Sequence, residues 1–119
     1  MTKGHGSDAN PGDGDRVDVD LELRHGAIVT IAVGPRDLPR GCETLRRAAD
    51  ALPRLVLGRT ADEARGIGLA EVLRALGPAG LENGRCVLAL IGALRAALID
   101  AHVAALAEAT IDLGKLTVK

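Results

Sequence analysis

The two cysteines of this chain, Cys42 and Cys86, are the residues whose type and position could do chemistry. Each follows a polar loop that contains glycine, Pro39-Arg40-Gly41 before the first and residues 82–85 before the second. Each also stands where a helix is predicted to begin, and the partial positive charge of a helix N-terminus favours a thiolate that binds metal or attacks an electrophile. The other interpretation, a small apolar side chain near a helix start, stays open because the sequence has no Cys-x-x-Cys pair.

The elements that must position these thiols begin with a predicted hairpin. From Arg16 onward apolar and charged residues alternate with a two-residue period, which is typical of a strand with one buried face. We expect the other face, which carries Asp18, Asp20 and Glu22, to be solvated. His25-Gly26 supplies a tight turn, and the β-branched run 27–33 returns as a second strand.

Helical patterns fill the rest of the chain. Residues 43–57 have apolar positions at helical spacing, with Pro53 expected to kink or divide the helix. Thr60-Ala61-Asp62-Glu63 matches a capping box that starts a short helix, and further helices are predicted over 69–76 and from Cys86 to about Ala109. This order predicts an α+β fold, in which helices cover one face of a small antiparallel sheet.

Composition limits the function classes. With 119 residues there is room for a single domain, and residues 1–14, rich in glycine and poor in apolar side chains, are predicted to be a flexible arm. The net charge of −1 and the absence of Phe, Trp and Tyr argue against nucleic-acid binding, which needs positive charge and stacking side chains. The longest apolar stretch, Val87 to Leu94, is too short to cross a membrane, and no signal peptide is evident. We expect a cytoplasmic protein.

Several motifs together resemble the U-type iron–sulfur cluster scaffolds, the IscU/NifU N-terminal family. In that family a Gly-Cys pair opens a helix that ends in Gly-Lys-Ser/Thr and continues as x-x-Glu-Ala. The corresponding motifs here are Gly41-Cys42, the stretch Gly58-Arg59-Thr60-Ala61-Asp62-Glu63-Ala64 at the same distance, Arg85-Cys86-Val87-Leu88, the Ala-rich segment 93–98, and Gly26-Ala27-Ile28-Val29 in the hairpin. The similarity runs from about Arg16 to about His102, and it implies a SufE/NifU-like fold over residues 15–119.

The resemblance implies an iron–sulfur cluster assembly scaffold or carrier rather than an enzyme. Family members hold a [2Fe–2S] cluster on three thiolates, and Cys42 and Cys86 match the second and third of them. The first has no counterpart, and with a one-residue slip Asp13 stands in its place while Asp15 stands for a family Asp. Arg85 replaces a family His, and a guanidinium cannot coordinate metal. The implied partners are a cysteine desulfurase and other cluster-assembly or acceptor proteins.

Two other functions stay open at this point. A paralogue could keep the fold, lose the cluster and act as an interaction or regulatory module. A thiol enzyme would need His5, His25 or His102 beside a cysteine in the folded chain. A core without aromatic side chains also buries less area per residue, so we expect stability to depend on a homo-oligomer or a partner.

Overall fold

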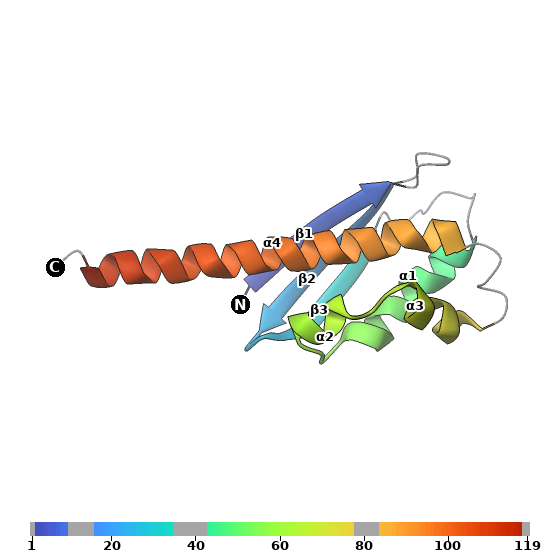
Figure 1. Ribbon diagram of the computed structural model, residues 1–119, viewed down its shortest axis with the longest axis horizontal. Coiled ribbons are helices and arrows are strands. Elements are labelled where there is room, and N and C mark those ends of the chain that lie inside the picture. Colours follow the sequence, from blue (N-terminus) through green and yellow to red (C-terminus); the bar gives the residue numbers. More distant parts are fainter. Residues whose placement is uncertain (1, 10–15, 35–42, 78–83, 118–119) are drawn as a thin grey trace.

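The computed structural model describes residues 2–9, 16–34, 43–77 and 84–117. Within them an antiparallel sheet has the strand order β1-β2-β3, formed by β1 (Thr2–Ala9), β2 (Arg16–Arg24) and β3 (Ala27–Gly34). The helices that follow are α1 (Glu43–Val56), α2 (Ala61–Arg65), α3 (Leu69–Leu76) and α4 (Gly84–Thr117). All pack on one side of the sheet, with α4 crossing β1 and β2 (Figure 1). The predicted α+β fold, hairpin first and helices afterwards, is confirmed.

The prediction that residues 1–14 form a flexible arm is wrong for Thr2–Ala9. This segment is strand β1, which pairs with β2 along its whole length, from Thr2 opposite Leu23 to Ala9 opposite Arg16. The pattern of apolar residues in the sequence could not reveal this strand, because the residues that β1 turns toward α4 are glycines and not large apolar residues. The strand is held by backbone hydrogen bonds to β2 and by close packing on α4, and not by the burial of side chains.

Gly4 and Gly6 are both buried where β1 meets α4. A Cβ at Gly6 would overlap the carbonyl oxygen of Ala93 and the amide nitrogen of Ala97, and a Cβ at Gly4 would overlap the carbonyl oxygen of Ala97. The two glycines therefore let the backbone of α4 approach the backbone of β1 directly. The glycine content that suggested flexibility is what this close contact requires.

The hairpin forms where it was predicted. His25 has φ 53° and Gly26 has φ 80°, as a two-residue turn with left-handed backbone at both positions requires. The pairing of β2 with β3 shifts register between Glu22 and Leu23, so β3 carries a bulge at that level. The alternation predicted for β2 is confirmed, because Val17, Val19 and Leu21 are buried.

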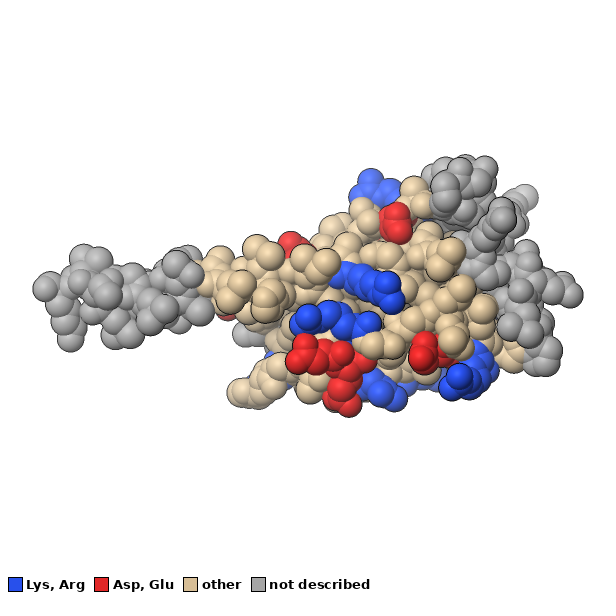
Figure 2. All heavy atoms as spheres, viewed as in Figure 1, with Lys and Arg blue, Asp and Glu red and all other residues tan. Residues whose placement is uncertain are grey.

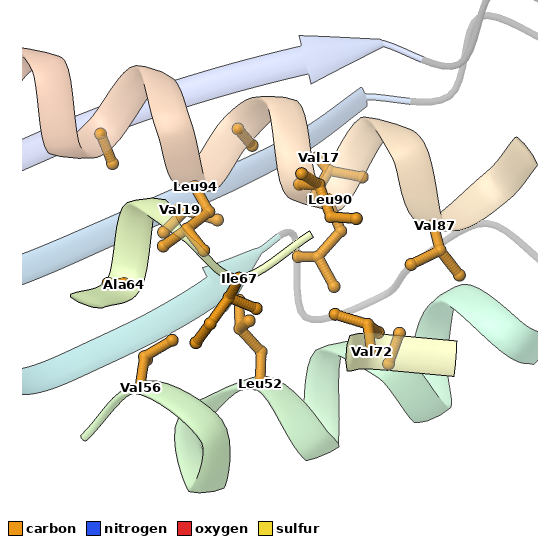
Figure 3. Close-up of a cluster of buried hydrophobic side chains, with 14 of the residues drawn as sticks. Val17, Val19, Leu52, Val56, Ala64, Ile67, Val72, Val87, Leu90 and Leu94 are labelled. Atoms are coloured by element: carbon orange, nitrogen blue, oxygen red, sulfur yellow. The ribbon is translucent and has the colours of Figure 1, made fainter. Parts of the chain in front are cut away.

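The core is built from aliphatic side chains of β2, β3 and every helix. Figure 3 shows Val17 and Val19 of β2 facing residues from α1, α3 and α4. The largest fully buried side chains are Leu21, Ile28, Leu52, Leu90, Leu94, Leu98, Val17, Val19, Val56, Val72 and Val87. Pro53 does not divide α1, which continues to Val56, and the Pro53 carbonyl accepts a hydrogen bond from the Leu57 N–H at 2.9 Å. Helix α4 reaches Thr117, beyond the predicted end near Ala109.

The capping box at α2 is confirmed, and a related cap begins α3. The Thr60 hydroxyl accepts from the Glu63 N–H and the Glu63 carboxylate accepts from the Thr60 N–H, both at 3.1 Å. At α3 the Glu71 carboxylate accepts from the Gly68 N–H at 2.8 Å. These bonds from backbone N–H groups hold the pKa of Glu63 and of Glu71 below the usual 4.5.

Acidification is therefore expected to weaken both helix starts. A carboxylate with a lowered folded pKa stabilises the fold fully above pH 4.5, and this contribution is lost as the pH falls through the folded value. We expect the Tm of the Glu71→Gln variant to fall less steeply than that of the wild type between pH 7 and pH 3 in thermal unfolding followed by circular dichroism. Equal slopes for the two proteins would contradict this role of Glu71.

Candidate functional site

The four predicted site residues lie outside the described segments or at the start of one of them. Asp13, Asp15 and Cys42 lie outside the described residues. Cys86 lies in the first turn of α4, as the sequence predicted, and the described side chains of this helix begin at Val87. The structure therefore shows the elements that flank these residues.

Those flanking elements end or begin at one end of the domain. Ala9 pairs with Arg16 and Gly34 pairs with Asp18, so β1 and β3 finish at the same end of the sheet at which β2 begins. Helices α1 and α4 also begin at this end, on the right in Figure 1. The described residues nearest in sequence to the four candidates therefore meet at this end: β1 ends at Ala9, β2 begins at Arg16, α1 begins at Glu43 and α4 begins at Gly84.

Buried residues hold the starts of both helices against the core. Leu45 in the first turn of α1 is 2% exposed, and Val87, the residue after Cys86, is fully buried. Each cysteine therefore lies within three residues of a core side chain. This anchoring fixes where the two helix N-termini point, which a metal site needs, and it is equally compatible with cysteines that serve as small apolar residues.

A complete metal site is not found in the part of the chain that the structure describes. No group of three or more His, Cys, Asp or Glu there could hold a metal ion. A site at this end would therefore have to include side chains outside the described ones, such as those of residues 10–15, 35–44 or 78–86. The four ligands predicted from the sequence, Asp13, Asp15, Cys42 and Cys86, fall in these ranges.

No described histidine lies beside Cys86. The backbone N–H of His5 donates to the Asp100 carboxylate at 2.8 Å, so His5 lies beside Asp100. Asp100 is fourteen residues along α4 from Cys86, about 21 Å at the rise of an α-helix. His102 is farther along the same helix, and His25 lies in the β2–β3 turn at the opposite end of the sheet. None of the three histidines therefore lies near position 86 of α4, which argues against a Cys86–His pair in the thiol-enzyme alternative.

A second polar surface lies on the sheet face that the helices leave open, and sequence reasoning missed it. His5 Nδ1 is 2.7 Å from Asp20 Oδ1, and His5 Nε2 is 3.9 Å from Asp18 Oδ1. The surrounding hollow, about 430 Å³, is lined among others by Lys3, His5, Asp20, Glu22, Thr30 and Asp100. Because β1 was not predicted, nothing in the sequence pattern could pair His5 with Asp20.

The charges on this open face are paired with one another. Lys3 lies 3.8 Å from Glu22, and Arg16 lies 3.0 Å from Asp18. Exposed pairs of this kind contribute little to stability. The expectation of a solvated strand face is confirmed for Asp20, whose side chain is 65% exposed.

Helix α4 is apolar over a long stretch. Its segment Val87–Glu108 is long and apolar enough to cross a membrane by length and composition, but half of it is buried inside the protein. The buried half is the face that packs on the sheet, as expected for a core helix. Length and composition alone are weak evidence for a membrane span.

Comparison with known proteins adds no relative. No protein-family model matches the sequence, and no curated protein matches it significantly.

Proposed function

We propose that this chain is an iron–sulfur cluster assembly scaffold or carrier, which binds iron or a transient [2Fe–2S] cluster through Cys42 and Cys86. The observation that carries the proposal is the meeting, at one end of the domain, of the elements that flank both cysteines and both candidate aspartates. Thiolates are soft anionic donors, the ligands that iron–sulfur clusters use most. The resemblance to the U-type scaffolds points to the same residues.

The ligand count shapes the form of the proposal. A [2Fe–2S] cluster has four protein ligands, and this chain has two cysteines. Asp13 and Asp15, which follow β1 in the sequence, are the candidates for the remaining positions in one chain. The alternative is a cluster held between two protomers that each donate Cys42 and Cys86. In either form Arg85 cannot serve as a ligand, and its cation would lie beside an anionic cluster.

The partners of such a protein follow from its chemistry. A scaffold needs a source of sulfide sulfur, which a cysteine desulfurase supplies, and acceptor proteins that take the finished cluster. The chain itself holds and transfers its cargo and catalyses no reaction of its own. We place this activity in the cytoplasm, where free thiols stay reduced.

Anaerobic reconstitution tests the proposal. Wild-type protein incubated with ferrous iron, sulfide and a thiol reductant is expected to acquire sulfide-dependent visible absorption that remains with the protein after desalting. The same protein treated with iron and a strong chelator is the control, and it should stay colourless. A protein that binds neither iron nor sulfide would overturn the proposal and favour the cluster-free interaction module.

A further inference from the structure

We propose that strand β1 is a detachable edge of the sheet, which opens from β2 and α4 as one unit while the rest of the domain stays folded. The Asp100 carboxylate is the latch that holds β1 closed. Opening uncovers the backbone edge of β2, which β1 otherwise occupies. This inference concerns the fold of the chain by itself and does not depend on iron or cluster binding.

Strand β1 contributes no large apolar side chain to the core of the described chain. The residues that it buries against α4, Gly4 and Gly6, have no side chain at all. In β3, by contrast, Ile28 is fully buried, and Ile31 and Val33 pack against the core. Burial of large apolar side chains is the main force that holds an element to a fold, so β1 lacks the anchor that β3 has.

The part of α4 that β1 covers is made of small residues. The α4 atoms nearest to Gly4 and Gly6 belong to alanines within residues 93–101. The large side chains of the same helix, such as Leu90 and Leu94, point instead toward β2 and the other helices (Figure 3). Removal of β1 therefore exposes mainly alanine surface on α4 and leaves the core of large side chains in place.

The two edge strands are also tied differently on their outer sides. Ile28 of β3 donates to the Arg59 carbonyl and accepts from the Gly58 N–H, both at 2.8 Å, so β3 has backbone hydrogen bonds on both sides. In the part of the chain that the structure describes, β1 has backbone partners in β2 alone. Strand β1 can therefore leave by breaking one ladder, whereas β3 would have to break bonds on two sides.

Asp100 is the α4 side chain that binds the backbone of β1. Charged side chains are few along α4 (Figure 2), and among the described residues the hydrogen bond from the His5 N–H to the Asp100 carboxylate, 2.8 Å, is the one that joins β1 to α4. A hydrogen bond to an ionised group is stronger than one between neutral groups. The other polar contacts of β1, His5 with Asp20 and Lys3 with Glu22, are exposed pairs that contribute little. The closed position of β1 therefore depends most on Asp100.

The direction of the His5 N–H fixes which backbone groups of β2 face β1. This N–H points away from β2 to Asp100, so the N–H of Asp20, the residue opposite His5, points to β3. The alternation of a strand then turns the N–H groups of Val19 and Leu21 to β1. Opening of β1 frees these two groups and leaves the Asp20 N–H bonded to β3.

Native-state amide hydrogen exchange, followed residue by residue by NMR in low denaturant, tests this opening. We expect the Val19 and Leu21 amides to be at least about tenfold less protected than the Asp20 amide between them, because opening of β1 exposes only the first two. Denaturant should accelerate exchange at Asp20 more steeply, since global unfolding exposes more surface than the opening of one strand. An Asp20 amide that is no better protected than its two neighbours would overturn the proposal.

Asp100→Ala tests the latch in the same experiment. We expect the protection of the two β2 amides that face β1 to fall at least about fivefold, while that of Asp20 stays nearly unchanged. Asp100→Asn should lose less, because the amide oxygen still accepts from the His5 N–H. Asp50→Ala is the matched control, since Asp50 is also an exposed aspartate within a helix. Equal protection of the β1-facing amides in Asp100→Ala and Asp50→Ala would overturn the assignment of the latch.

Discussion

Replacing Gly6 by Ala is expected to lower the free energy of unfolding by about 3 kcal/mol, the upper part of the usual range for overpacking. The added methyl group would overlap the Ala93 carbonyl oxygen and the Ala97 amide nitrogen, both in the backbone of α4. Backbone atoms inside a helix cannot turn aside as a side chain can, so β1 and α4 would have to separate. In a domain of this size such a loss lowers Tm by roughly 12 to 24 °C.

Gly34→Ala is the matched control for this prediction. Gly34 is also a strand glycine, its φ is not in the left-handed region, and nothing lies within 4 Å of the position of an added Cβ. Its Tm should stay within a few degrees of the wild-type value, because the added methyl group meets open space. Denaturant unfolding of both variants measures the difference. If Gly6→Ala is as stable as Gly34→Ala, α4 does not approach β1 as closely as described.

Sequence periodicity found the elements that bury apolar side chains and missed the one that does not. The alternation in β2, the turn at His25-Gly26 and the cap at Thr60 each have a local cause, and each is confirmed. Strand β1 has a non-local cause, because its buried residues are Gly4 and Gly6 and only the presence of α4 makes them core positions. A pattern of side chains cannot report a contact made by backbone.

The candidate site shows the same division between local and non-local information. The start of a helix at Cys86 could be predicted from the residues around it, and it is confirmed. That the flanks of Cys86, Cys42 and Asp13 share one end of the domain depends on the up-and-down order of three strands, of which the sequence predicted two. The pairing of His5 with Asp20 depends wholly on β1, so no local motif could have predicted it.

Replacing either cysteine is expected to remove most of the bound iron and sulfide. Two thiolates are the strongest donors the chain can offer, and loss of one leaves a single thiolate with carboxylates that do not favour a sulfide-bridged cluster. In Cys86→Ala and in Cys42→Ala we expect the visible absorption after reconstitution to fall to about a tenth or less. Asp13→Asn and Asp15→Asn should reduce it less, since a carboxylate is the weaker ligand for this cargo.

The stability of the same variants separates a ligand from a small apolar residue. If Cys86 is a ligand, Cys86→Ala and Cys86→Ser should have similar Tm values without iron, and both should fail to bind it. If Cys86 serves packing beside Val87, the polar Ser variant should unfold at a lower temperature than the Ala variant, while iron and sulfide retention should not depend on the thiol. Leu88→Ser is the control in the same turn, because Leu88 is 51% exposed and the change keeps both thiols. Full absorption in Leu88→Ser with none in Cys86→Ala would assign the binding to the thiol itself, whereas equal absorption in both would contradict the proposed site.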